Sequence, residues 1–429
     1  AQKAAKKYGL KMLYGAELYM IDTKLDYIMN PAPIELTAAT YVVFDFETTG
    51  LSPRYDRAIE FGAVKVEKGM LTKRIDILIN PGSEHSLSDK ISKITNIKNA
   101  DLIGKPTFKE VALKILDFIG DAILVSHNAQ FDISFLNSEL ERINKPKITN
   151  PVIDTLPLSR YLFPDARAHR LGALASRLEV DYDTVRAHRA DYDAEVLNNV
   201  WQAMIAKLTA NNRSLSHEDL VHLETKPELY KHLRPVHVIA LAKDEIGMKD
   251  LFKLISLSNI EFLAEVPKIP REVLMQYREH LLLGSACFNG EVFDMSRTRN
   301  EEDLKKAVSF YDYIEIQPPE NYSYLIHMGE LASKNDLFTY LHDIIKVAKE
   351  MGKMVVATGD CHYANPSDKI YRDVYIMAKG VGGVNHPLAP YDRERIPPFE
   401  NPNQHYRSTE EMLTEFQADN FISEEEAIQ

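Results

Sequence analysis

The strongest chemical pattern in the sequence is a pair of carboxylates, Asp45 and Glu47, in the segment DFETTG. Residues two apart on a strand point to the same face, so these two carboxylates lie side by side. Neighbouring carboxylates repel each other unless a cation lies between them, and Mg²⁺ is a natural partner for oxygen ligands. A pair of solvated acids on an edge strand is the alternative. The apolar run YVVF before the pair and the glycine turn after it favour a site at the strand end.

Two further segments carry acids and histidines that could join this pair. In SHNAQFD, a short apolar strand ends at His127 and Asn128, and Asp132 then opens a helix, where the helix dipole favours an acid. In AHRADYDAE, His188 and Asp193 would be about 140° apart on a continuous helix. They can share a site only if His188 lies in a loop and Asp193 in the first turns of the helix. Taken singly, each segment could equally be an ordinary polar helix start.

The elements that must position these motifs follow from the hydrophobic pattern. YVVFDFE, IEFGAVKV, RIDILIN and AILVS predict strands, and the pattern predicts helices over 108–119, 132–143 and 190–208. Thr107 and Glu110 form a capping-box pattern at the start of the first helix. Strands come early and helices later, which predicts an α/β unit with a mixed sheet. From 209 to about 385, strand and helix patterns alternate, which is typical of a layered or barrel-like α/β domain.

Together, the three motifs resemble the DEDDh family of 3′→5′ exonucleases, related to the proofreading subunits of replicative polymerases. The family pattern is D-x-E-T-T-G, H-N-x-x-F-D and H-x-x-x-x-D, and VIDTL and HRLGALA are also similar to family segments. The resemblance covers roughly residues 38–208 and implies a ribonuclease-H-like fold. It also implies hydrolysis of phosphodiester bonds with two Mg²⁺ or Mn²⁺ ions.

The resemblance assigns roles to residues of this chain. It implies a general base at His188, since imidazole exchanges a proton near neutral pH. The metal ligands that it implies are Asp45, Glu47, Asp132 and Asp193. The residues expected to touch the terminal nucleotide are Phe46, Thr48, Thr49, His127, Asn128 and Phe131. The two phenylalanines could instead belong to the core.

The segments on either side resemble a second family, the PHP (polymerase and histidinol phosphatase) domains. KMLYGAELYMID lies before the exonuclease pattern, and GSACFNGEVF and VVATGDCHY lie after it. The ligands that this resemblance implies, for Zn²⁺ or Mn²⁺, are Glu17, His237, Cys287, Asp360 and His362. Asp360 and His362 are two apart after an apolar strand and face one way, which would turn Cys361 toward the core.

A PHP domain interrupted by a DEDDh exonuclease resembles the PolC-type bacterial DNA polymerase III α subunit. LFKLISLSNIEFLAEV and HYRSTEEMLTEF are similar to segments of that family. The resemblance implies a first PHP segment over 1–36, the exonuclease over 37–208, a second PHP segment over 209–400 and a junction toward a polymerase core over 401–429. The first PHP motifs would lie upstream of this chain, so we expect an incomplete metal cluster and a barrel that is open or patched.

These resemblances imply a proofreading exonuclease that removes a mispaired 3′ nucleotide from DNA as a 5′-monophosphate. The implied partners are single-stranded or frayed DNA, the rest of the polymerase and the sliding clamp. The motifs specify cleavage and not the sugar, so RNA or short oligonucleotides are the alternative substrates. A mainly structural PHP part is favoured over an active phosphoesterase, because ligands are missing.

Composition sets the outer limits on these functions. The chain has 429 residues with 63 acidic and 51 basic side chains, a net charge of −12. That charge argues against coating nucleic acid through a broad basic surface, but it permits contact in a local groove. The two cysteines exclude a disulfide scaffold and fit a reducing cytoplasm. No apolar run approaches about 18 residues, so we expect no membrane span, and no signal peptide is visible.

Overall fold

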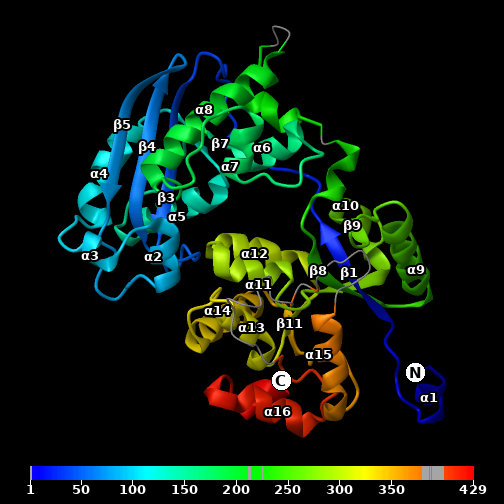
Figure 1. Ribbon diagram of the computed structural model, residues 1–429. Coiled ribbons are helices and arrows are strands. Elements are labelled where there is room, and N and C mark those ends of the chain that lie inside the picture. Colours follow the sequence, from blue (N-terminus) through cyan, green and yellow to red (C-terminus); the bar gives the residue numbers. More distant parts are fainter. Residues whose placement is uncertain (1, 211–213, 225, 379–385, 387, 389–400) are drawn as a thin grey trace.

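The computed structural model describes residues 2–210, 214–224, 226–378, 386, 388 and 401–429, which form two α/β bodies (Figure 1). Each body is built around a six-stranded sheet. The predicted boundary near residue 400 lies at the edge of a stretch outside the described residues. Every helix of the described residues is too short or too polar to span a membrane.

The sheet of the first body is mixed, as the sequence predicts, with strand order β2-β7-β6-β3-β4-β5. Its strands are β2 (Ile28–Met29), β3 (Thr40–Thr48), β4 (Ala58–Glu67), β5 (Met70–Leu78), β6 (Ile123–Ser126) and β7 (Val152–Asp154). β3, β4 and β5 form an antiparallel meander, whereas β6 runs parallel to β3 and β7 parallel to β6. The carboxyl ends of β3, β6 and β7 therefore meet at one edge of the sheet.

Helices cover both faces of this sheet. They are α2 (Asp89–Thr95), α3 (Asn99–Leu102), α4 (Phe108–Ile119), α5 (Ala129–Arg142), α6 (Thr155–Leu162), α7 (Leu171–Arg177) and α8 (Ala190–Leu208). Alternate residues of β3 enter different cores: Val43 packs in the cluster of α8, and Phe44 in the cluster of α4 and α5. The predicted capping box is present, with the Thr107 N–H donating to Glu110 at 2.7 Å. Because both faces of β3 are buried against helices, the position of the strand that carries the first motif is fixed between the two layers.

The sheet of the second body joins segments from both ends of the chain, in the order β12-β11-β10-β8-β1-β9. Its strands are β1 (Gly15–Ile21), β8 (Val236–Ala242), β9 (Lys268–Pro270), β10 (Leu281–Gly284), β11 (Tyr313–Ile316) and β12 (Met354–Ala357). β1 pairs antiparallel with β8 although the first body lies between them in sequence, and Figure 1 shows this blue strand against green β8. Among the described residues, the edge strands β12 and β9 do not pair, so the sheet is open.

Helices pack on this second sheet and form one large apolar core with it. The α-helices outside the first body are α1 (Gln2–Lys7), α9 (Glu245–Ile260), α10 (Arg271–Met275), α11 (Glu291–Thr298), α12 (Glu301–Phe310), α13 (Ser323–His327), α14 (Lys334–Glu350), α15 (Lys369–Met377), α16 (Thr409–Gln417) and α17 (Glu424–Ile428), of which α1 and α15 contribute no residue to this core. Short 3-10 turns are η2 (Glu218–His222), which packs in the core beneath α8 of the first body, and η3 (Pro227–Lys231), η4 (Arg278–His280), η5 (Pro319–Tyr322), η6 (Pro366–Asp368) and η8 (Ala418–Asn420). The acidic segment FISEEEAIQ contains the short helix α17.

The prediction that Cys361 faces the core is wrong, because its side chain is exposed. β12 ends at Ala357, and Asp360 has a φ of +49°. The strand alternation on which the prediction relied therefore stops before it reaches Cys361.

The two bodies touch beside the first two exonuclease motifs. Arg54, in the loop that follows β3, lies 3.0 Å from Asp343 of α14 and donates to the Ser296 carbonyl at 2.7 Å. Tyr55 also donates to Asp343. Gln130, at the start of α5, donates to Asp303 of α12 at 2.9 Å. Residues next to the candidate site are therefore anchored on the second body.

Candidate active site

The end of β3 places Asp45 and Glu47 against the middle of β4. In the antiparallel register, Asp45 lies opposite Gly62 and Glu47 lies opposite Glu60. The pairing shifts between Glu47 and Thr48, so the ladder becomes irregular directly after the second acid. The side chains of both predicted ligands therefore project from the same face of a regularly paired strand.

Asp132 reaches this strand from α5. Its Oδ1 accepts the Phe46 main-chain N–H at 3.0 Å, and its Oδ2 accepts the Ser126 hydroxyl at 2.5 Å. The sequence predicted that Asp132 opens the helix, but α5 already begins at Ala129, after Asn128 in a left-handed conformation. Asp132 therefore lies in the first turn, and it is almost fully buried.

The third motif brings its histidine and acid together across the start of α8. His188 lies in the loop before the helix with a φ of +62°, and its N–H donates to Oδ2 of Asp193 at 3.0 Å. Ligand atoms of Glu47, His188 and Asp193 all lie within 4.8 Å of one another. Oδ1 of Asp193 is buried and has no hydrogen-bond partner in the described structure.

Electrostatics at this cluster favour a bound cation. Burial raises the pKa of Glu47 to about 9, helped by the charges of Glu60 and Asp193. Burial also raises the pKa of Asp132 to about 7. The pKa of Asp45 is raised by burial and by the charges of Asp132 and Glu47. Four clustered carboxyl groups whose pKa values are all raised, with one buried oxygen of Asp193 unpartnered, fit a site for divalent cations.

The threonines and the histidine predicted to meet the substrate are already hydrogen-bonded. Thr48 donates to the Gly50 carbonyl at 2.6 Å, and Thr49 donates to Asp56 at 3.1 Å. Burial lowers the pKa of His127 to about 4, so its imidazole is neutral at pH 7. Its Nδ1 lies 2.9 Å from the Thr155 hydroxyl. These residues shape the walls beside the acids, and contact with a substrate stays a prediction.

The remaining predicted contact residues differ in exposure. The ring of Phe46 is 3% exposed and packs 5.0 Å from that of Phe61, within the core. Phe131 is half-buried and its ring lies 4.8 Å from that of Phe135. A cavity of about 450 Å³ opens beside His188 and Asp193, and its wall residues include Arg170, Leu171, Gly172, Tyr182 and Thr184.

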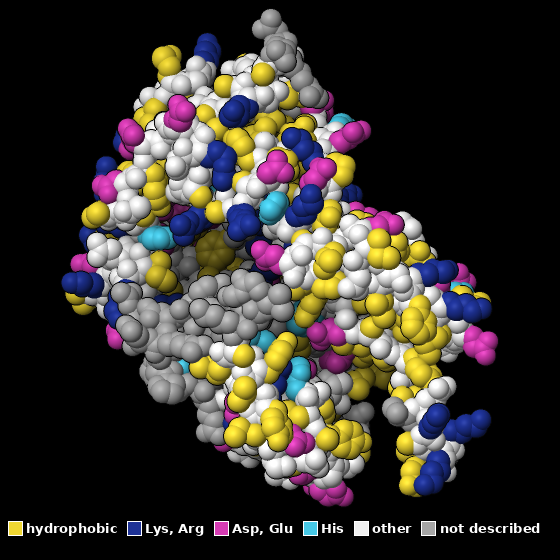
Figure 2. Space-filling view, turned by 45° about the vertical axis from the view of Figure 1, so that its right-hand side comes forward, with side chains coloured by type: hydrophobic (Ala, Val, Ile, Leu, Met, Phe, Trp, Pro, Cys, Tyr) yellow, Lys and Arg dark blue, Asp and Glu magenta, His cyan; other side chains and the backbone are white. Residues whose placement is uncertain are grey.

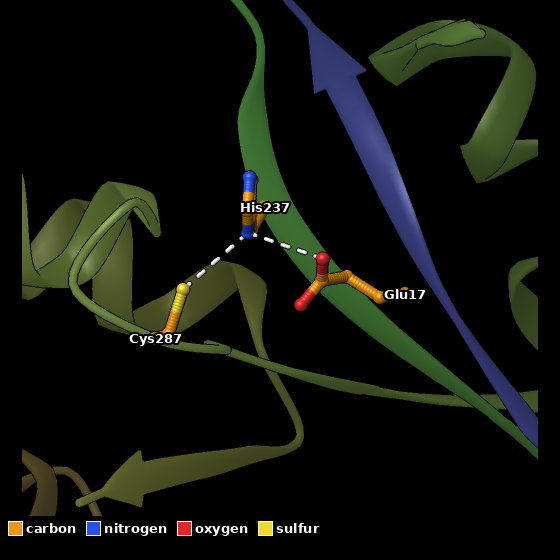
Figure 3. A group of neighbouring side chains, drawn as sticks. All are labelled: Glu17, His237 and Cys287. Carbon is orange, nitrogen blue, oxygen red and sulfur yellow. Dashed lines mark hydrogen bonds and ion pairs between the residues drawn. The ribbon is translucent and has the colours of Figure 1, made fainter. Parts of the chain in front are cut away.

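A second group of possible metal ligands lies in the other body (Figure 3). Nδ1 of His237 is 3.2 Å from Oε1 of Glu17 and 3.3 Å from Sγ of Cys287. The three side chains come from β1, from β8 and from the segment after β10, and their ligand atoms lie within 4.8 Å of one another. Burial raises the pKa of the Cys287 thiol well above its usual range.

The structure does not bring all five predicted PHP ligands into that group. Asp360 accepts the Gln404 amide at 2.9 Å and lies 3.5 Å from Nε2 of His362. Both residues lie outside the cluster formed by Glu17, His237 and Cys287. The Asp360 charge still contributes to the raised pKa of Cys287, so the two sets are neighbours.

Comparisons with known proteins agree with both bodies. Residues 42–200 match the model of the exonuclease family, and residues 177–322 match that of the PHP domain. The DNA polymerase III PolC-type of Bacillus subtilis (strain 168) is 40% identical over 428 residues, which is 100% of this chain and 28% of that protein. The chain belongs to the PolC-type DNA polymerase III family. It spans about 28% of the length of the curated relatives it matches.

Other members of the PolC-type family are similar to the same extent. The protein of Streptococcus pneumoniae serotype 4 is 38% identical over 427 residues, or 99% of this chain and 28% of that protein. Among solved structures, Exonuclease X in complex with 5′ overhanging duplex DNA is 23% identical with a TM-score of 0.34. That similarity covers 42% of this chain and 99% of the solved one.

An ion pair that was not predicted from the sequence lies directly behind the candidate site of this PolC-type chain. Glu60 of β4 is fully buried, and its carboxylate accepts Arg189 at 2.6 Å. It also accepts the Ala190 main-chain N–H at 2.9 Å. A charged residue within the apolar segment IEFGAV was the available signal, because a buried glutamate needs a partner.

Proposed function

We propose that the exonuclease domain of this chain removes nucleotides from the 3′ end of DNA as 5′-monophosphates, using Mg²⁺ or Mn²⁺. The observation that carries the proposal is the convergence of acids from β3, α5 and α8 at the end of β3, with His188 beside them. This oxygen-rich set suits hard divalent cations. In the whole protein, we propose that this activity proofreads newly added nucleotides.

Each residue of the site has one part in the proposed reaction. Asp45, Glu47, Asp132 and Asp193 would hold two ions, which supply Lewis acidity toward the phosphate and its leaving oxygen. The imidazole of His188 would take the proton of the attacking water. The main-chain N–H of His188 donates to Asp193, which holds the backbone of the proposed base next to a proposed ligand. Burial of the acids keeps bulk water away and strengthens these interactions.

The substrate is proposed to be a single-stranded or frayed 3′ end. Figure 2 shows a recess on one face of the molecule with Lys and Arg side chains along its upper rim. Such a local basic rim can hold phosphates although the net charge is −12. A mispaired end frays more readily than a paired one, which would supply the discrimination that proofreading needs.

The second body is proposed to act mainly as a scaffold. The pairing of β1 with β8 supports a PHP domain whose segments, about 1–36 and 209–400, enclose an exonuclease domain at 37–208, with a junction at 401–429. The Glu17–His237–Cys287 group would hold Zn²⁺ or Mn²⁺ if this part binds metal. The rest of the polymerase and the sliding clamp are proposed partners of the whole protein.

Nucleotide release from matched primers tests the exonuclease proposal. Paired, mispaired and single-stranded DNA ends are offered to the wild-type chain with Mg²⁺, with Mn²⁺ or with a chelator, and RNA of the same sequence is offered in parallel. We expect metal-dependent release of 5′-monophosphates, fastest from single-stranded and mispaired DNA, and none from Asp45→Ala. Near-normal release by Asp45→Ala would refute the site, and faster release from RNA would replace the proposed substrate.

A further inference from the structure

Behind the candidate site, Arg189 and the buried carboxylate of Glu60 form an ion pair. Nε and Nη2 of Arg189 donate to Oε1 of Glu60 at 3.0 and 2.6 Å, and Nε also lies 3.3 Å from Oε2. The Glu60 side chain is fully buried, whereas that of Arg189 is 36% exposed. A buried carboxylate is costly unless its oxygens are hydrogen-bonded, and here both oxygens have donors.

Glu60 also closes the amino end of α8. Arg189 is the residue that precedes the helix, and its own side chain makes no cap there. The first helical N–H, that of Ala190, donates instead to Oε2 of Glu60 at 2.9 Å. Main-chain N–H groups of a first turn have no partner within the helix, so a carboxylate from the sheet satisfies one of them. The helix that carries Asp193 is therefore fixed at its first residue to β4.

The same contact fixes His188. This residue precedes Arg189 and has a φ of +62°, a conformation that non-glycine residues adopt only when their surroundings hold them there. Its main-chain N–H donates to Asp193, and the next two residues, Arg189 and Ala190, both donate to Glu60. Glu60 in turn lies opposite Glu47 in the β3–β4 ladder. One side chain thus connects the strand of the first motif to the loop of the third.

β4 is shaped to receive the start of α8 at this height. Gly62 lies two residues beyond Glu60 and therefore on the same face of the strand. A Cβ atom at Gly62 would lie 2.1 Å from the Ala190 carbonyl carbon and 2.2 Å from the Asp191 nitrogen. The backbone of α8 therefore rests directly on the strand, which makes the Glu60 contact short and sets the depth of Asp193.

We propose that Glu60 and Arg189 are positioning residues of the exonuclease, which hold His188 and Asp193 in register with Glu47. The inference rests on the proposed exonuclease function and deepens it. Glu60 is buried beneath the site, and the Arg189 guanidinium is engaged by the Glu60 carboxylate. Their loss should therefore lower kcat, through misplacement of base and ligand, and leave the KM for DNA nearly unchanged.

Two conservative variants test the proposal on the full 429-residue chain. Arg189→Lys keeps the charge but loses the planar fork, and Glu60→Gln keeps the shape and one acceptor oxygen. We expect each to lower kcat by about 10- to 100-fold on single-stranded DNA, with KM changed by less than about 3-fold. The Arg189 side chain is partly exposed, so Arg189→Ala should still fold. We expect this variant to regain activity when a guanidinium compound is added.

A matched control is available on the same helix. Arg74 of β5 makes a two-point contact with Glu195 of α8 at 2.6 and 3.0 Å; the Arg74 side chain is exposed and that of Glu195 is half-buried. Arg74→Lys removes the same kind of fork from Glu195, which lies two residues beyond Asp193 on α8, and we expect its kcat to equal that of the wild type. Wild-type kcat in both Arg189→Lys and Glu60→Gln would overturn the inference, whatever their stability, as would a rise in KM alone. An inactive wild type would instead refute the proposed function itself.

Discussion

The Phe46 main-chain N–H donates to Oδ1 of Asp132 at 3.0 Å, so α5 is fastened to β3 at the residue between the two acids of the first motif. A side chain proposed as a metal ligand thus also has a structural role. Its second oxygen accepts the hydroxyl of Ser126. Changes at Asp132 must therefore be designed to separate loss of charge from loss of the strand contact.

Asp132→Asn makes that separation, because the amide keeps an acceptor for Phe46 but loses the negative charge. We expect kcat to fall by at least about 100-fold, with the thermal midpoint lowered by only a few degrees. Ser126→Ala removes only the outer hydrogen bond and should raise the Mg²⁺ concentration for half-maximal activity by about 10-fold. The control is Ser134→Ala, another buried serine, in α5. Equal Mg²⁺ requirements in the two serine variants would contradict this.

The raised pKa values predict how pH acts on the metal-free protein. The pKa of Glu47 is about 9 and that of Asp132 about 7, whereas both groups ionise near pH 4 in an unfolded chain. Between these limits the native state binds more protons than the unfolded state, so stability falls as pH rises. In the presence of a chelator, we expect the thermal midpoint to be lower at pH 9 than at pH 6. Added Mg²⁺ should raise the midpoint by more at pH 9 than at pH 6.

Glu47→Gln isolates this effect, because it removes one titrating group and keeps the shape of the side chain. Without metal, the variant should lose less of its thermal midpoint than the wild type between pH 6 and pH 9. In Mg²⁺ it should be inactive and gain less stability from the ion. Parallel pH dependences for the two proteins would show that the carboxyl cluster does not govern this loss.

Alanine substitutions at Gly62 and Gly69 should differ in effect, because the first displaces the start of α8 and the second only strains the backbone. Gly62→Ala would push Ala190 away from β4, so we expect a loss of about 1–3 kcal/mol in the free energy of unfolding and a fall in kcat. Gly69 has a φ of +76°, and a Cβ atom there would meet only Oε1 of Gln202, at 4.0 Å. Gly69→Ala should cost about 1 kcal/mol through backbone strain and leave kcat unchanged. Denaturant unfolding and single-turnover kinetics measure both, and a normal kcat for Gly62→Ala would contradict the contact.

The sequence predicted the strands that carry the motifs, because β3 and β4 are continuous apolar runs and α8 has a strict apolar face. It could not predict the start of α5, since the left-handed Asn128 that permits it depends on Asp154, which accepts its N–H at 3.0 Å from β7. The partner of Glu60 was equally hidden, because Arg189 is 129 residues away in the chain. Contacts of that separation depend on packing, which local periodicity does not contain.

The two cysteines should differ in reactivity. Burial raises the pKa of Cys287, so in the metal-free protein it is a protonated thiol beside His237, whereas Cys361 is exposed. We expect a disulfide reagent at pH 7.5 to modify one thiol in the native chain and two after unfolding. In the native state of Cys361→Ser, no thiol should then be modified. Rapid modification of both thiols in the native wild type would contradict the buried arrangement.

Asp343 is predicted to couple the two bodies, because both Arg54 and Tyr55 from the loop after β3 bind it. Asp343→Ala leaves the Arg54 guanidinium, whose side chain is 13% exposed, without its ion pair and should cost about 1–3 kcal/mol. Calorimetry should then resolve two transitions where the wild type shows one. The control is Glu302→Ala, which removes an exposed pair with Lys147 at 3.3 Å and should cost less than about 1 kcal/mol. If both variants unfold alike, the Asp343 contact does not join the bodies, and the loop after β3 is positioned by the exonuclease domain alone.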